Sequence, residues 1–261
     1  TNLTFRLGTS FVTLVTGDTL GEFSTSNLTF ADGSRLLIGD DTRNTSRDAL
    51  ANTLVGGAGN DRLIGLGGND NLDGREGSDT YVVMGANDGT DLYHDTGLTG
   101  TDRIVAGAAG AVINLGASFS AAASGIEAIG ANGHAGVSVV GSAGADSLNF
   151  TGVTLSGLTA IDAKGGADAV VGSAGNDTVK GGAGNDSIDG GAGSDTAVFA
   201  GARASYAVTR SGGIVQVRDT DALANGDDGT DALMLFHRKM GIAALALVVG
   251  HAPLLARGDD G

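Results

Sequence analysis

The chain has 261 residues, of which 30 are acidic and 15 are basic, and its formal net charge is -15. This charge disfavours nucleic acid and anionic membranes as partners, because both bind basic surfaces, and it favours cations. The chain has no cysteine, which excludes disulfide bonds and thiolate metal sites from it. Its 47 glycines lack a Gly-X-Y period and come with a single proline, so they predict a repeat architecture rather than collagen or a disordered tract.

Residues 1–46 are predicted to form an N-terminal β segment. The start of this segment lacks the basic residues and the continuous apolar core of a secretory signal peptide. We therefore expect the chain, which begins with Thr1, to be a fragment or a processed product of a longer protein.

Two stretches of the chain, residues 55–83 and 171–199, align with each other without a gap. An aspartate recurs every nine residues within and beside each stretch, and an apolar residue follows two positions after most of these aspartates. A degenerate unit at residues 47–55 keeps the phase with Asn52 in place of aspartate. The aspartates in phase are Asp61, Asp70, Asp79 and Asp88 in the first stretch, and Asp168, Asp177, Asp186 and Asp195 in the second. The apolar residues are Leu63, Leu72, Tyr81, Val170, Val179 and Ile188.

The nine-residue period predicts a coil of short strands. Nine residues divide into a six-residue turn and a three-residue strand, so two units form one coil of 18 residues. Parallel strands stack about 4.8 Å apart, which brings aspartates of successive coils together on one side. The pattern predicts that Asp61 lies over Asp79, Asp70 over Asp88, Asp168 over Asp186 and Asp177 over Asp195. The apolar residues of both sides then face each other in a thin core.

The turn glycines and the stacked carboxylates both have a cost that a bound cation would offset. Positive φ angles are easy only for glycine, and two carboxylates about 5 Å apart repel by roughly 3 kcal/mol at an effective dielectric constant of about 20. Calcium takes roughly six to eight oxygen ligands, whereas magnesium demands a tighter octahedron, so calcium fits these turns better. The alternative is a glycine-rich solenoid that binds no ion, in which aspartate need not recur in phase. The turn glycines expected at the ions are Gly57, Gly59, Gly77, Gly182, Gly184 and Gly193.

The motif GGxGxDxUx, in which U is apolar, is matched by "GGAGNDRLI" (56–64), "GGAGNDSID" (181–189) and "GGAGSDTAV" (190–198). With these motifs the chain resembles the repeats-in-toxin, or haemolysin-type, calcium-binding modules of bacterial proteins that type I systems secrete. The resemblance implies an all-β fold, a parallel β-roll or β-solenoid, that binds several Ca²⁺ ions. It also implies an extracellular or cell-surface location, the type I secretion machinery as a partner, and folding coupled to export.

The remaining stretches complete the predicted organisation. The two repeat blocks are offset by 116 residues, one short of thirteen nines, so the phase must slip between them, and Asp102 is out of phase. The apolar run at 241–256 is short for a membrane span and is predicted to be buried or covered by a partner, not inserted in a membrane. Apolar residues expected to stack between the blocks are Val105, Ile113, Ile126, Val139 and Leu148. The predicted parts are the N-terminal β segment 1–46, a first calcium-binding block 47–91, a calcium-poor spacer 92–162, a second calcium-binding block 163–199, a β cap 200–240 that contains two alternating strands, and an apolar tail 241–261.

The sequence contains no motif of an enzyme. A phosphate-binding GxxxxGK[ST], a GxSxG nucleophile elbow and an HExxH zinc motif are all absent, and the four histidines are dispersed. The chain is therefore predicted to have no catalytic residues and to be a calcium-binding module that folds after secretion and supports a larger exported protein. The alternative is a structural repeat segment of a bacterial surface adhesin or surface-layer protein. An enzymatic or adhesive domain would then lie upstream.

Overall fold

The computed structural model describes residues 2–7, 10–15, 28–39, 50–200, 203–211, 214–220, 228–234 and 246–249. Nearly all of the regular structure in these residues is β, and the exceptions are the four-residue helix α1 (Ala121–Ser124) and the 3₁₀ turn η2 (Arg203–Ser205). The chain divides into two compact units, which are described separately. Unit 1 comprises Thr1–Gly116, Ser120–Val139 and Ser156–Leu158, and unit 2 comprises Ala117–Phe119, Val140–Leu155 and Thr159–Gly261.

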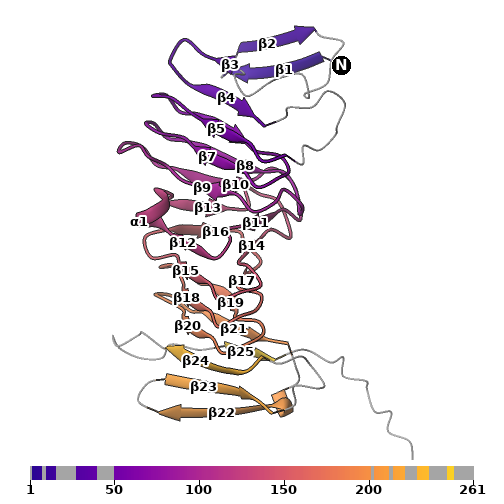
Figure 1. Ribbon diagram of the computed structural model, residues 1–261, viewed down its shortest axis with the longest axis vertical. Coiled ribbons are helices and arrows are strands. Elements are labelled where there is room, and N and C mark those ends of the chain that lie inside the picture. The colour runs from indigo at the N-terminus through magenta and orange to yellow at the C-terminus, as the bar shows by residue number, and fades with distance from the viewer. Residues whose placement is uncertain are drawn as a thin grey trace, which may run out of the picture. The chain divides into compact units, whose positions relative to one another are not determined.

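Unit 1 is a coil whose strands alternate between two parallel sheets (Figure 1). One sheet contains, in order, β4 (Arg35–Ile38), β6 (Arg62–Ile64), β8 (Thr80–Val83), β10 (Arg103–Ala106) and β13 (Ala128–Gly130). The other contains β5 (Thr53–Val55), β7 (Asn71–Asp73) and β9 (Leu92–Tyr93). The strands before the coil pair antiparallel, β1 (Asn2–Leu7) with β2 (Ser10–Val15) and β3 (Leu28–Thr29) with β4. Each turn of the coil therefore ends beside the matching turns of the coils before and after it.

Unit 2 repeats this arrangement. One parallel run contains β15 (Ser147–Asn149), β18 (Ala169–Val171), β20 (Ser187–Asp189) and β24 (Thr230–Met234), and the other contains β17 (Ile161–Asp162), β19 (Thr178–Lys180), β21 (Thr196–Phe199) and β25 (Ala246–Val249). The two alternating cap strands predicted from the sequence are confirmed as β22 (Tyr206–Ser211) and β23 (Ile214–Asp219), an antiparallel pair. Strand β24 pairs parallel with β20 and antiparallel with β23, so it joins the coil to the cap. The remaining short strands are β11 (Val112–Asn114), β12 (Ser118–Ser120), β14 (Ser138–Val140) and β16 (Thr154–Ser156).

The core of each unit is a row of single apolar side chains. The middle residue of a three-residue strand points inward while its neighbours point outward, as the alternation of a strand requires. The predicted core residues Leu63, Leu72, Tyr81, Val170, Val179 and Ile188 are all buried, and so are Ile113, Ile126, Val139 and Leu148. Val105 is only half-buried, because it follows the inward-pointing Ile104 in β10.

The register of the coils agrees with the nine-residue period in each block and departs from it after Asp79. Leu63 pairs with Tyr81, and Val170 pairs with Ile188, as predicted. The next coil of unit 1 is longer, because Leu72 pairs with Tyr93, 21 residues on. Extra residues in a turn lengthen the coil without changing which strands stack.

The apolar tail lies partly outside the described residues. Its residues 246–249 form β25, which pairs parallel with β21 in unit 2. No helix in the described part of the chain has the length and apolar character needed to cross a membrane.

Candidate calcium-binding sites

The aspartate that ends each turn is buried just before the next strand begins. Its position follows from the repeat, in which the turn closes at the aspartate and the strand starts one residue later. The side chains of the predicted ligands Asp61, Asp70, Asp79, Asp168, Asp177 and Asp186 are between 0% and 6% exposed, and Asp195 is half-buried. A buried carboxylate is strongly unfavourable unless hydrogen bonds or a cation compensate it.

The first carboxylate oxygen of most of these aspartates, Oδ1, accepts a hydrogen bond from a backbone N–H one coil earlier. The N–H of Asp61 donates to Asp79 Oδ1 at 2.6 Å, and the N–H of Asp168 donates to Asp186 Oδ1 at 2.9 Å. The same bond joins Asn52 to Asp70, Asp70 to Asp91, Asp79 to Asp102, Asp146 to Asp168, Asp177 to Asp195 and Asp186 to Asp231. This row of bonds, the aspartate ladder, gives each aspartate a structural role that needs no ion.

The ladder corrects one predicted ligand of the first block. The period predicts that Asp88 stacks on Asp70, but Asp91 takes that position, because the turn before β9 is three residues longer than the period allows. Asp88 instead accepts the N–H of Gly85 within its own turn, at 3.0 Å. The second oxygen of Asp91 accepts the hydroxyl of Tyr93 at 3.0 Å, so it already has a partner.

The prediction that Asp102 lies outside the row of stacked aspartates is also wrong. The period places it out of phase, yet the N–H of Asp79 donates to its Oδ1 at 2.6 Å, and its own N–H donates to Glu127 Oε2 at 2.7 Å. The second half of the motif, G-x-D-x-apolar, could have found it, because the half-motif survives where the turn is longer. It occurs as "GTDLY" (89–93), "GTDRI" (100–104), "GADSL" (144–148) and "GTDAL" (229–233), and as "GIEAI" (125–129) with glutamate.

The second oxygen, Oδ2, distinguishes two conformations of the turn. In the first conformation, which we call closed, the second residue of the turn donates its backbone N–H to Oδ2 of the aspartate that ends it. In the part of the chain that the structure describes, closed turns have Gly57, Ser142 and Ser173 as donors and Asp61, Asp146 and Asp177 as acceptors. The hydroxyls of Ser142 and Ser173 also donate to these aspartates. In a closed turn, donors of the protein therefore already bond to the carboxylate of the aspartate that ends the turn.

In the second conformation, which we call open, the second residue of the turn is left-handed. These residues are Leu66 at φ 71°, Arg75 at φ 70°, Lys164 at φ 77°, Gly182 at φ 98° and Gly191 at φ 81°. The rotation turns the N–H away from the aspartate. Consequently Oδ2 of Asp79, Asp168 and Asp186 is buried and has no hydrogen-bond partner. Where the left-handed residue is not glycine, as at Leu66, Arg75 and Lys164, this geometry costs about 1–2 kcal/mol in addition. An ion at Oδ2 would offset these costs.

The other predicted glycines lie where coils approach closely. At Gly77, Gly184 and Gly193 φ is between 122° and 124°, and an added Cβ would lie within 2.4 Å of a carbonyl oxygen of the preceding coil. An added Cβ at Gly59 would lie 2.3 Å from the backbone nitrogen of Ser34. Gly57 differs, because its turn is closed and the atoms nearest to an added Cβ would be those of the Arg35 side chain, at 3.2 Å.

Arg35 covers the first turn of the coil in unit 1. Its backbone N–H donates to Asp61 Oδ1, and its Nη1 donates to the carbonyl of Gly56 at 3.1 Å. Burial raises the pKa of Asp61, while the hydrogen bonds from Gly57 and Arg35 and the positive charge of Arg35 lower it. The positive charge of Arg35 therefore already lies beside this turn.

The electrostatics of the open turns favour a bound cation. Burial, with a smaller contribution from nearby carboxylates, raises the pKa of Asp79 to about 7 and that of Asp186 to about 6. Burial likewise raises the pKa of Asp168. A raised pKa means that the fold disfavours the charged carboxylate, and a positive ion at the same oxygens reverses that preference. Carboxylate and turn-carbonyl oxygens are the ligands that calcium takes.

Comparison with known proteins identifies the repeats. Residues 48–81 and 162–197 match the RTX calcium-binding nonapeptide repeat family. No curated protein matches the chain. The matched residues contain Asp61, Asp70 and Asp79 in unit 1, and Asp168, Asp177, Asp186 and Asp195 in unit 2. In these two segments the chain consists of RTX calcium-binding nonapeptide repeats, and the ion that they bind is Ca²⁺.

Proposed function

We propose that the chain is an extracellular module that folds when calcium fills its open turns, after type I secretion, and that it supports a larger exported protein. The observation that carries this proposal is the buried Oδ2 without a hydrogen-bond partner in Asp79, Asp168 and Asp186. RTX repeats are structural calcium-binding modules, which agrees with a supporting role. The proposal keeps 47–91 and 163–199 as the two calcium-binding blocks.

The calcium ligands are assigned by the conformation of each turn. The open turns that end at Asp79, Asp168 and Asp186 supply an unshared carboxylate oxygen, so we assign ions to them first. The closed turns that end at Asp61 and Asp177 bind calcium more weakly, because an ion there must displace a backbone N–H from Oδ2. Asp88 is not a ligand of the repeat type, since Asp91 takes its position after Asp70 in the aspartate ladder.

The coupling of folding to calcium follows from the cost of the empty fold. Buried carboxylates and left-handed residues destabilise the folded chain when no ion is present, and only the folded chain brings the ligands together. A site of dissociation constant about 10⁻⁴–10⁻³ M, typical of extracellular calcium modules, stays empty in the cytosol. One site filled at about ten times its dissociation constant adds about 1.4 kcal/mol of stability, so several sites together can decide folding.

A calcium titration followed by far-UV circular dichroism tests the proposal. We expect the chain to be largely disordered in chelator and to gain β signal cooperatively as calcium is added. Magnesium should be a poor substitute, because it demands a tighter octahedral shell. The same spectrum in chelator and in saturating calcium would rule out calcium-driven folding.

A further inference from the structure

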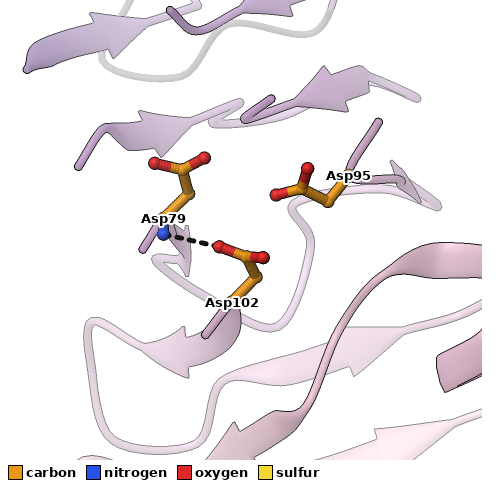
Figure 2. Close-up of side chains that lie close together, drawn as sticks. All are labelled: Asp79, Asp95 and Asp102. Atoms are coloured by element: carbon orange, nitrogen blue, oxygen red, sulfur yellow. Dashed lines mark hydrogen bonds between the residues drawn. The ribbon is translucent and has the colours of Figure 1, made fainter. Parts of the chain in front are cut away.

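A third carboxylate enters the calcium-binding side of unit 1 beyond the matched repeats. Asp79 precedes β8 and Asp102 precedes β10, and these strands are parallel neighbours in which Thr80 pairs with Arg103. Asp95 begins the turn that Asp102 ends. One carboxylate oxygen from each of the three aspartates lies within 4.8 Å of those of the other two, and Figure 2 shows the three side chains converging.

Two of the three carboxylates each point a buried oxygen without a partner toward this cluster. The side chain of Asp79 is fully buried, its Oδ1 accepts the N–H of Asp61, and its Oδ2 has no hydrogen-bond partner. Asp95 Oδ1 accepts the N–H of Gly97 at 2.6 Å, and its Oδ2 is also buried without a hydrogen-bond partner. Among the described residues no lysine or arginine forms an ion pair with any of the three. Within the described part of the chain, their negative charges therefore have no positive partner.

The main chain holds Asp95 in this position. The N–H of Asp95 donates to the carbonyl of Ser124 at 2.6 Å, and the N–H of His94 donates to the carbonyl of Leu72 at 3.0 Å. The hydroxyl of Tyr81 donates to the carbonyl of His94 at 3.3 Å and accepts the N–H of Gly74. The Tyr81 hydroxyl thus connects His94, the residue before Asp95, to Gly74, the first residue of the turn that ends at Asp79.

We infer that Asp79, Asp95 and Asp102 together hold a calcium ion more tightly than any turn of the nonapeptide repeat does. This inference rests on the proposed calcium-dependent function and adds to it a site of three carboxylates, of which two lie outside the matched segments. Calcium affinity in proteins rises with the number of charged ligands, and this site brings three carboxylates together. Trivalent lanthanides are similar in size to calcium and carry a larger charge, so Tb³⁺ should prefer this site over those with fewer carboxylates.

Terbium luminescence reports on this site because of where the aromatic residues lie. The chain has no tryptophan and three tyrosines, and the hydroxyl of Tyr81 is hydrogen-bonded to the residue before Asp95. Energy transfer from an excited tyrosine to Tb³⁺ requires the two to be close. We expect the first equivalent of Tb³⁺ added to the full chain in calcium to give tyrosine-sensitised emission, and Tyr81→Phe to reduce it. The emission that remains should come from Tyr93, whose ring centroid lies 6.0 Å from that of Tyr81. A silent first equivalent, or full emission from the Tyr81→Phe chain, would overturn the inference.

A matched pair of substitutions tests the ligand itself. Asp95→Asn removes one charge from the cluster. Asp189→Asn is the control, because Asp189 also accepts the backbone N–H of the residue two positions later, Gly191, but does not belong to such a cluster. In calcium titrations of the full chain we expect Asp95→Asn to lower the calcium affinity of the tightest class of sites about tenfold or more. Asp189→Asn should leave that class unchanged, and both variants should still gain β signal in saturating calcium.

The outcomes separate this inference from the proposed function. If wild type gains β signal with calcium but Asp95→Asn binds as Asp189→Asn does, the three-carboxylate site is wrong and calcium-driven folding stands. If wild type gains no β signal, the proposed function itself fails. Should Asp95→Asn fold poorly in saturating calcium, the terbium titration of wild type and Tyr81→Phe decides the matter.

Discussion

The backbone N–H of Asp61 donates to Oδ1 of Asp79, one coil away, at 2.6 Å. This bond ties the stacking of coils to the aspartate independently of any ion, so the recurrence of aspartate is not by itself evidence for calcium. A calcium-free solenoid of this kind would keep the aspartates in phase for the sake of the ladder. The evidence for an ion lies in the other oxygen, which the fold buries and leaves without a partner in Asp79, Asp168 and Asp186.

Substitutions at Asp186 should separate the two roles of the carboxylate. Asp186→Asn keeps an oxygen for the N–H of Asp168 but loses the charge, so the calcium midpoint of folding should rise about tenfold. Asp186→Ala should do the same and also leave that N–H without its acceptor, which costs a further 1–3 kcal/mol or so. Urea unfolding in saturating calcium measures the second effect. Equal stabilities of the two variants would show that the ladder contributes nothing.

Opening a closed turn should add calcium-binding capacity. Ser173 donates both its N–H and its hydroxyl to Asp177, and Ser173→Gly removes the hydroxyl and permits the left-handed conformation of Gly182 and Gly191. We expect the variant to bind calcium more tightly in the second block, or to bind one more ion, by equilibrium dialysis. Ser194→Gly, which changes an exposed serine in the turn one coil later, is the control. Identical binding by both variants would contradict the distinction between open and closed turns.

The sequence predicts the coil well because each three-residue strand buries one apolar side chain, as Leu63 and Val170 do. It fails where turn length changes, since the count of nine selects Asp88 although the half-motif G-x-D-x-apolar selects Asp91. The motif also does not predict whether a turn is open or closed. Ser173 resembles glycine in size yet closes its turn, whereas Arg75 departs from the motif and opens its turn. That difference is one of φ, which depends on packing against the neighbouring coil.

Relief of left-handed strain should stabilise unit 2. Lys164 has φ 77° and an exposed side chain, so Lys164→Gly removes an unfavourable backbone conformation without removing a core contact. We expect the variant to be about 1 kcal/mol more stable in saturating calcium, by urea unfolding. Ala143→Gly changes an exposed turn residue that is not left-handed, and should be neutral or destabilising by up to about 1 kcal/mol. A loss of stability in Lys164→Gly would mean that its side chain contributes more than the strain costs.

Acid should partly replace calcium. In the folded chain without calcium, burial is the main reason why the pKa of Asp79 rises to about 7, that of Asp186 to about 6 and that of Asp231 to about 8. Because these values lie above the ordinary 3.8, the folded chain takes up protons that the unfolded chain does not. The resulting stability is fully present below about pH 4 and is lost as the pH rises through about 6–8.

Circular dichroism of the calcium-free chain between about pH 8 and pH 5 measures this effect. We expect β signal to increase as the pH falls, and the increase to shrink in Asp79→Asn with Asp231→Asn, which cannot take up those protons. In saturating calcium the signal should vary less over the same range, because the ion already neutralises the carboxylates. A calcium-free chain that loses β signal on acidification would contradict the raised pKa values.

The two blocks should fold as separate cooperative units. Each site needs turns of neighbouring coils, and the stability of a coil is a sum over nearest neighbours, so cooperativity should extend along a block. Asp95 and Asp102 lie between the matched segments, but they group with Asp79 of the first block. The rest of that stretch contains Asp91, whose second oxygen is bonded to Tyr93, and the closed turn that ends at Asp146. Few open turns are therefore present there to link the blocks through bound ions.

Hydrogen exchange tests this division. In Asp70→Ala with Asp79→Ala we expect residues 50–83 to lose calcium-dependent protection while residues 169–199 stay protected. The reciprocal pair, Asp168→Ala with Asp186→Ala, should leave the first block protected. Loss of protection in both blocks from either pair would show a single cooperative coil instead.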